Sequence, residues 1–122
     1  MKVLLNDEIL ERNEAKVDIE DRGYQFGDGV YEVVNIYNGV PFTLKEHIER
    51  LYRSAKEIGI LLNEQPEHLC NRLLELIDVN YMTKGGLYLQ ISRGVSNRSH
   101  HYDQSITPQL VAYPLPYKSV EE

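Results

Sequence analysis

The sequence contains one cysteine and no tryptophan among its 122 residues. Because Cys70 has no second cysteine to pair with, the chain cannot form an internal disulfide, which is typical of a protein from a reducing compartment. Cys70 stands beside Leu69 and Leu73 in a helical pattern. We therefore interpret it as a small core residue rather than a nucleophile.

Long apolar runs are also absent. No run approaches the roughly 18 residues needed to span a bilayer, and the N-terminus has no apolar segment of the signal-peptide type. We therefore expect a cytoplasmic protein that makes no membrane contact. Positive charge is scarce as well, because the net charge is −6 at pH 7. This balance argues against a nucleic-acid-binding surface.

What the chain does have is the composition of an ordinary globular domain. Hydrophobic residues make up 42% and charged residues 26% of the sequence, so we expect order except at the ends. A chain of this length can bury a core without metal or disulfide support. There is no internal repeat.

The first half of the chain predicts two hairpins. Short apolar runs at residues 3–5 and 9–10 flank a polar turn, and acidic residues at 18–21 suggest one irregular helical turn. Residues 30–37 are β-branched and aromatic, and Asn38-Gly39 then supplies the signal for a type I′ turn before residues 40–42.

Two helices are predicted between groups of strands. Thr43 and Glu46 have capping-box spacing, so we expect the Thr43 hydroxyl to accept a hydrogen bond from the Glu46 backbone N–H, with a helix starting at Leu44. The predicted apolar stripe of this helix, which ends before Gly59, comprises Leu44, Ile48, Leu51, Ala55 and Ile58. Pro66 marks the start of the second helix. Its expected apolar residues are Leu69, Leu73, Leu76, Ile77 and Tyr81.

The rest of the chain predicts more strands. Gly85-Gly86 should end the connection after the second helix, and residues 87–92 then alternate between apolar and polar as a strand does. A last short strand is expected at 109–113, followed by an extended exit stiffened by Pro114 and Pro116. Strands, two helices and further strands predict an α+β domain with a mostly antiparallel sheet.

The most unusual stretch is residues 21–32, in which three glycines alternate with aromatic residues. Such a backbone can turn sharply and pass close to a ligand or to another chain segment. It can equally be a simple turn that feeds the following strand. Tyr31 leaves this stretch onto the strand, where pattern alone favours an ordinary cross-strand aromatic.

Three other residues carry groups suited to binding an anion. Arg50 lies on a helix rich in glutamate, so a solvated ion pair is its default role. Arg98 and His100 alternate, so in an extended loop they would project to one side and could hold a carboxylate. A plain surface loop is the alternative. The histidines at 47, 68 and 101 show no metal-ligand spacing with carboxylates or Cys70, so we predict no metal site.

Four segments together resemble the fold-type IV pyridoxal-phosphate aminotransferases, most closely the bacterial D-amino-acid (D-alanine) aminotransferases. They are DRGYQFGDGVYEVV at 21–34, YNG at 37–39, EHIERLYRSA at 46–55 and YLQISRGVSNRSH at 88–100. The resemblance covers essentially the whole chain. It implies an amino-group transfer from a D-amino acid to pyridoxal 5'-phosphate and then to a 2-oxo acid such as 2-oxoglutarate or pyruvate.

The same resemblance assigns roles to residues of this chain. It implies that Arg50 binds the cofactor phosphate, and that Tyr31, Arg98 and His100 hold the substrate α-carboxylate. Val33 matches a residue that lines the pocket beside Tyr31. The Arg98–His100 loop would reach into the partner subunit's site, which implies a homodimer. Branched-chain aminotransferases and aminodeoxychorismate lyases share the scaffold and are the alternatives, but they are not expected to carry the Arg98–His100 pair, which therefore disfavours them.

Length separates the chain from the family that it resembles. Members are more than twice as long, and their Schiff-base lysine lies beyond residue 122, so no catalytic residue is expected in this chain. We expect residues 1–113 to form the small N-terminal domain and 114–122 to begin the interdomain linker, with the large catalytic domain absent. Such a chain should be inactive alone. An alternative is a non-catalytic module that self-associates through its exposed apolar surface.

Overall fold

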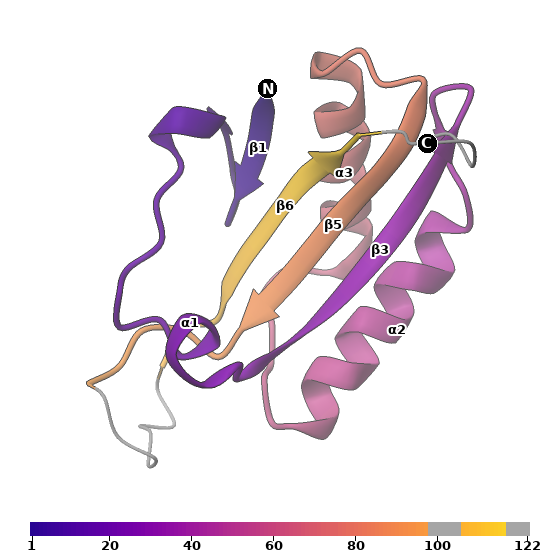
Figure 1. Cartoon of the computed structure of the whole chain (residues 1–122). Helices are drawn as coiled ribbons and strands as arrows, with labels where there is room; N and C mark the ends of the chain where they lie inside the picture. Colours follow the sequence, from indigo (N-terminus) through magenta and orange to yellow (C-terminus); the bar gives the residue numbers. More distant parts are fainter. Residues whose placement is uncertain (98–105, 117–122) are drawn as a thin grey trace, which may run out of the picture.

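The protein forms a six-stranded antiparallel sheet with two long helices on one face (Figure 1). The computed structural model describes residues 1–97 and 106–116. The strands lie in the order β2-β1-β6-β5-β3-β4. Their bounds are β1 Lys2–Leu5, β2 Glu8–Glu11, β3 Gly29–Tyr37, β4 Val40–Pro41, β5 Lys84–Ser92 and β6 Gln109–Leu115. The predicted α+β class with an antiparallel sheet is confirmed.

Both predicted hairpins are present. β1 and β2 pair directly across a two-residue turn. Between β3 and β4, Asn38 has a φ of 52° and Gly39 a φ of 77°, so both central residues are left-handed, as a type I′ turn requires. The irregular helical turn expected at 18–21 is instead a turn and an isolated bridge, and the helix α1 follows it at Arg22–Phe26.

Helix α2 (Leu44–Glu57) starts where predicted, but its predicted cap is wrong. Thr43 has a left-handed φ of 52°, and its hydroxyl donates to the carbonyl oxygen of Phe42 at 2.7 Å. An N-cap side chain reaches the first turn from an extended backbone, so the tight turn after β4 removes that option. Ile48, Leu51 and Ala55 are buried as expected, whereas Ile58 lies beyond the helix end and is 40% exposed.

Helix α3 (Pro66–Val79) has proline in its first turn and buries four of the five predicted residues. Tyr81 is the exception, because it lies past the helix end and is 90% exposed. Gly85 and Gly86 also differ from the prediction, since they belong to β5 and pair with β3 rather than ending the connection. A Cβ on Gly86 would lie 3.2 Å from the Val34 carbonyl oxygen, so a small residue suits this close pairing.

The last strand is longer than predicted. β6 continues through Leu115, and Pro114 pairs with Leu87 of β5 instead of beginning an exit. β1 pairs with β6 only at Leu5 and Leu4, opposite Val111 and Ala112. Within residues 1–97 and 106–116, Pro114 therefore lies where one side of β6 has no partner strand, which is where a sheet tolerates proline.

Strand alternation divides the sheet into two faces. Val34 and Ile36 of β3 are buried beneath the helices, as are the side chains of Leu87, Leu89 and Ile91 of β5. Tyr31 and Val33 point the other way and are 66% and 39% exposed. We call the side of β3, β5 and β6 opposite α2 and α3 the open face (Figure 1). Among the described residues, no helix is long and apolar enough to cross a membrane.

Glycine at position 29 should be far harder to replace than glycine at position 27. An added Cβ on Gly29 would lie 2.3 Å from the Ile91 carbonyl oxygen, inside the β3–β5 ladder. We expect Gly29→Ala to lower the free energy of unfolding by about 2 to 4 kcal/mol. Gly27 has a φ of 65° with nothing near its Cβ position, so Gly27→Ala should cost only about 1 kcal/mol. Urea unfolding measures both, and equal losses would contradict the steric argument.

Candidate functional site

Arg50 forms a two-point ion pair with Glu32. Its Nε donates to Glu32 Oε2 at 2.9 Å, and its Nη2 donates to Oε1 at 2.7 Å. Glu32 comes from β3 and Arg50 from α2, so the pair joins the sheet to the helix layer. The two ends differ in exposure, because the Glu32 side chain is 9% exposed and that of Arg50 58%. The pair is therefore more than the solvated surface contact that sequence pattern alone suggests.

Glu32 is a charged residue on the buried side of its strand. It alternates in phase with Val34 and Ile36, which pack in the core. Burial alone raises the pKa of Glu32, but hydrogen bonds from Arg50 and His47 outweigh it, and the net pKa lies below the ordinary value. The carboxylate is thus ionised at neutral pH. Its alternation with Val34 in the sequence could have identified Glu32 as a residue on the buried side of the strand.

The remaining donors of Arg50 suit an anionic ligand. A guanidinium has five N–H groups, and two of them donate to Glu32. Within the described part of the chain, the other three have no acceptor. They belong to an exposed head whose plane is fixed by the bidentate pair, which is the geometry that binds phosphate oxygens well. The residues present therefore fit a phosphate-bearing cofactor at Arg50.

The open face carries a row of tyrosines across three strands. The Tyr31 and Tyr88 rings stack with centroids 5.9 Å apart, and Tyr88 contacts Tyr113 at 5.2 Å. Val33 pairs with Tyr88 in the β3–β5 ladder. Tyr31 and Val33 lie on the same face of β3, and their predicted roles in substrate binding stay predictions.

Arg50 and Tyr31 lie on opposite sides of β3. Tyr31 and Glu32 are neighbours in a strand, so their side chains project to opposite faces, and Arg50 follows Glu32. β4 pairs with β3 only at Ile36 and Tyr37, so on this side the other end of β3 has no partner strand among the described residues. A ligand that contacts both Arg50 and Tyr31 would lie along this edge. Arg98 and His100, the other predicted carboxylate ligands, are outside the described residues.

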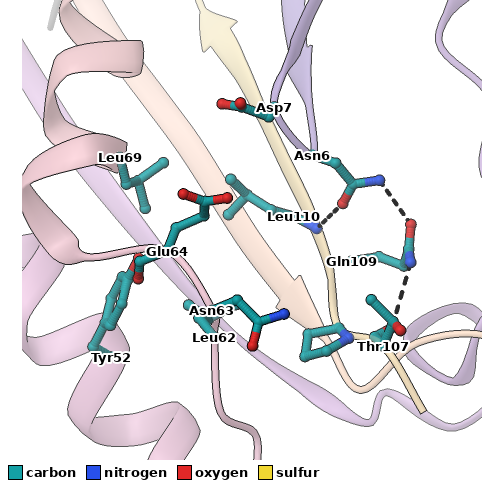
Figure 2. A pocket seen from close by; sticks show the side chains of 11 residues that line it. Asn6, Asp7, Tyr52, Leu62, Asn63, Glu64, Leu69, Thr107, Gln109 and Leu110 are labelled. Carbon is teal, nitrogen blue, oxygen red and sulfur yellow. Dashed lines mark hydrogen bonds between the residues drawn. The ribbon is translucent and has the colours of Figure 1, made fainter. Parts of the chain in front are cut away.

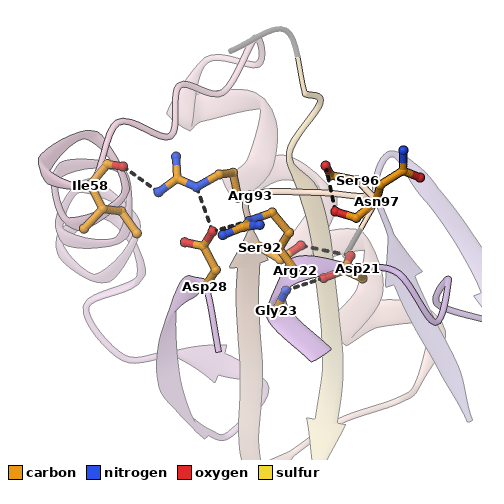
Figure 3. A network of polar contacts seen from close by, with 9 residues as sticks. All are labelled: Asp21, Arg22, Gly23, Asp28, Ile58, Ser92, Arg93, Ser96 and Asn97. Carbon is orange, nitrogen blue, oxygen red and sulfur yellow. Dashed lines mark hydrogen bonds and ion pairs between the residues drawn. The ribbon is translucent and has the colours of Figure 1, made fainter. Parts of the chain in front are cut away.

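The glycine-aromatic stretch is held by a polar network that sequence reasoning missed (Figure 3). The Asp28 carboxylate accepts hydrogen bonds from Arg22 Nε and Arg93 Nε, both at 2.8 Å. Arg93 also donates to the Ile58 carbonyl oxygen at 2.7 Å, which ties the network to the end of α2. The two arginines are buried, at 6% and 7% exposure. Positions 28 and 93 are far apart in sequence, so no local pattern reveals their pairing.

A second set of contacts holds α1 against the end of β5. Asp21 caps α1 by accepting a hydrogen bond from the Gly23 backbone N–H, and it also accepts one from the Ser92 hydroxyl. A Cβ on Gly23 would lie 2.8 Å from the Cβ of Ser92. The stretch thus passes close to another chain segment, which is one of the two alternatives that the sequence left open.

The carboxylate of Asp28 is ionised by the same balance as that of Glu32. Burial alone raises the pKa of Asp28, but hydrogen bonds from Arg93 and Arg22 outweigh it and leave the pKa below the ordinary value. Arg22 also lies over the Phe26 ring, with its guanidinium carbon 4.7 Å from the ring centroid. These contacts give the network a structural role.

A separate cavity of about 350 Å³ opens between the β1–β2 turn, the segment before α3 and the start of β6 (Figure 2). Next to it, ligand atoms of Asp7, Glu64 and His68 lie within 4.8 Å of one another. Arg72 also pairs with this cluster, because its Nε lies 3.2 Å from the Asp7 carboxylate. The absence of a metal site stays a prediction.

Cys70 packs against the core, and burial raises the pKa of its thiol, in agreement with its predicted packing role.

Comparison with known proteins gives one consistent family. The family described as "Amino-transferase class IV" matches residues 29–122. The D-alanine aminotransferase of Bacillus licheniformis is 57% identical over 122 residues, which is 100% of this chain and 43% of the relative. That of Staphylococcus aureus (strain N315) is 45% identical over 117 residues, covering 95% of this chain and 42% of the relative. The chain thus spans less than half the length of these relatives.

Solved structures support the same fold. The branched-chain amino acid aminotransferase of Escherichia coli matches with a TM-score of 0.89 and 21% identity, over 95% of this chain and 41% of the other. The 4-amino-4-deoxychorismate lyase of Pseudomonas aeruginosa matches with a TM-score of 0.75 and 21% identity, over 93% and 39%. At these identities the likeness establishes the fold alone.

Removing the charge of Asp28 should destabilise the chain severely. In Asp28→Asn, two buried guanidinium groups lose their shared carboxylate, so we expect the free energy of unfolding to fall by about 3 to 5 kcal/mol. Asp78 is an exposed carboxylate on α3, so Asp78→Asn should change it by less than about 0.5 kcal/mol. Urea unfolding at neutral pH compares the variants. A small effect at position 28 would show that the network does not hold the glycine-aromatic stretch.

Glu32 should make stability depend on pH in the acidic range. Its pKa in the folded chain is below the ordinary value of 4.5, so its contribution is complete above that value and is lost as pH falls through the folded-state pKa. We expect wild type to be more stable than Glu32→Gln at neutral pH and this difference to shrink as pH falls below the ordinary glutamate value of 4.5. Urea unfolding at several pH values tests this, and a constant difference would argue against an ionised, paired Glu32.

Proposed function

The chain belongs to the class IV aminotransferase family, and we propose that it is the N-terminal part of a pyridoxal-phosphate-dependent D-amino-acid aminotransferase. The observation that carries this proposal is its 57% identity, along its whole length, to a D-alanine aminotransferase. The complete enzyme would move the amino group of a D-amino acid such as D-alanine to a 2-oxo acid such as 2-oxoglutarate, in the cytoplasm. When bound, pyridoxal 5'-phosphate supplies the electron sink for this transfer.

In this proposal Arg50 binds the phosphate of the cofactor. A phosphate monoester carries about −1.5 to −2 charges at neutral pH, so charge-assisted hydrogen bonds to a guanidinium are its natural partners. The exposed guanidinium, with three N–H groups not used by Glu32, supports this assignment. Glu32 would keep the guanidinium plane in one orientation. Phosphate would then meet donors that are already aligned.

Tyr31 and Val33 would contact the substrate. The Tyr31 hydroxyl can donate to a carboxylate, and its ring is held by stacking on Tyr88. Val33 stands two residues along the same face of β3 and would limit the space beside the substrate. Arg98 and His100 would add a guanidinium fork and an imidazole to the carboxylate site of the partner subunit, which requires a homodimer.

The remaining groups for catalysis would come from the part of the family's length that this chain does not span. Its relatives are more than twice as long, so the chain alone would bind phosphate and carboxylate without completing the reaction. The open face, with its exposed tyrosines and Val33, is the surface against which a second domain and a second subunit would pack.

A branched-chain aminotransferase or an aminodeoxychorismate lyase is the second candidate, because solved structures of both share the fold. Their identity to this chain is 21%, compared with 57% for the D-alanine aminotransferase. The higher identity favours the D-amino-acid enzyme.

A fusion of this chain to the remaining segment of the Bacillus licheniformis relative tests the function. We expect the fusion to transfer the amino group of D-alanine to 2-oxoglutarate, to be inactive on L-leucine and 4-amino-4-deoxychorismate, and to sediment as a dimer. The 122-residue chain assayed beside it should show no turnover. Activity of the chain alone, or a preference of the fusion for L-leucine, would contradict the proposal.

A further inference from the structure

The Glu32 carboxylate has a second partner on α2 besides Arg50. Nδ1 of His47 lies 2.7 Å from Oε1, the same oxygen that accepts from Arg50 Nη2. His47 and Arg50 are three residues apart on one helix, so they present their side chains on the same face. Oε1 therefore contacts both side chains, whereas Oε2 contacts Arg50 alone.

The protonation of Glu32 determines which nitrogen of His47 carries hydrogen. An ionised carboxylate only accepts hydrogen bonds, so Nδ1 must be the donor at this distance. The imidazole therefore binds Glu32 through N–H whether or not Nε2 is protonated. While Glu32 is ionised, this contact does not depend on the charge of the histidine.

His47 also constrains the carboxylate in a way that Arg50 cannot. The arginine side chain is long and its head is exposed, so Arg50 and Glu32 could rotate together as one unit. The imidazole is short, has two side-chain torsions and is only 22% exposed. Its backbone N–H donates to the Thr43 carbonyl oxygen in the first turn of α2. The imidazole thus holds the carboxylate plane in a fixed orientation relative to the start of α2.

We propose that His47 is a positioning residue for the anion site, because it fixes the Glu32 carboxylate and through it the orientation of the Arg50 guanidinium. This rests on the proposed role of Arg50 in binding phosphate. His47 itself does not contact the phosphate in this arrangement.

Two substitutions separate the positioning role from a general loss of histidine. Asn places an amide nitrogen close to the position of Nδ1, so His47→Asn can keep the donor to Glu32. Gln places its amide nitrogen near the position of Nε2, so His47→Gln has similar volume but lacks the donor at Nδ1. His68→Gln removes another histidine that contacts a carboxylate, on α3, and is the matched control.

The experiment is an NMR titration of the 122-residue chain with inorganic phosphate, observing the Arg50 side-chain Nε–H. In wild type, His47→Asn and His68→Gln, we expect a sharp Arg50 signal that shifts with phosphate. In His47→Gln the signal should broaden, and the dissociation constant for phosphate should rise by about fivefold, which corresponds to the loss of one ordinary hydrogen bond. Backbone amide spectra verify that every variant is folded.

The outcomes distinguish this inference from the function on which it rests. If His47→Gln keeps the sharp Arg50 signal and the wild-type dissociation constant, the positioning role is wrong. Equal losses in His47→Asn and His47→Gln would also overturn it, because the donor at Nδ1 would then be irrelevant. If Arg50→Ala binds phosphate as wild type does, the proposed role of Arg50 fails, whereas the Arg50 signal in the histidine variants still decides the positioning.

Discussion

The fold around the candidate site depends on the partly buried Asp28 carboxylate and the two buried arginines that bind it. Arg22 belongs to the glycine-aromatic stretch and Arg93 to the end of β5, so one carboxylate joins segments that are far apart in sequence. Arg93 also reaches the carbonyl oxygen at the end of α2. Because an unpaired buried charge is costly, each member holds the others in place. The start of β3, and with it the position of Tyr31, is fixed by this network.

β3 then places two kinds of chemistry on its two sides. The same alternation that sends Val34 into the core sends Glu32 toward α2, and it sends Tyr31 to the open face. A charged residue in a core position normally destabilises a strand, but here two residues of α2 supply its hydrogen bonds. Glu32 therefore occupies a core position and still has hydrogen-bond partners. The cost of burying its charge is offset because α2 lies over this part of β3.

Much of this arrangement could be predicted from the sequence, since strands and helices follow local periodicity. Asn38-Gly39 and Pro66 marked a turn and a helix start correctly. The failures were positions where tertiary geometry outweighs a local signal. Thr43 has the spacing of a cap, but the tight turn after β4 forces its backbone into the left-handed region. The pairing of Asp28 with Arg93 has no local signature at all. The ion pair of Arg50 was expected, but its burial at Glu32 was not.

The unequal exposure of the Glu32–Arg50 pair is what distinguishes it from an ordinary ion pair. In an ordinary surface pair both charged groups are exposed to water, and the pair contributes little to stability. Here the carboxylate is buried and its oxygens are occupied, whereas the guanidinium faces solvent with donors to spare. If a phosphate binds those donors, the guanidinium lies between two anionic groups and screens each from the other. A carboxylate that also contacts His47 can stay ionised beside such a ligand. Glu32 can then orient Arg50 without expelling the anion that Arg50 attracts.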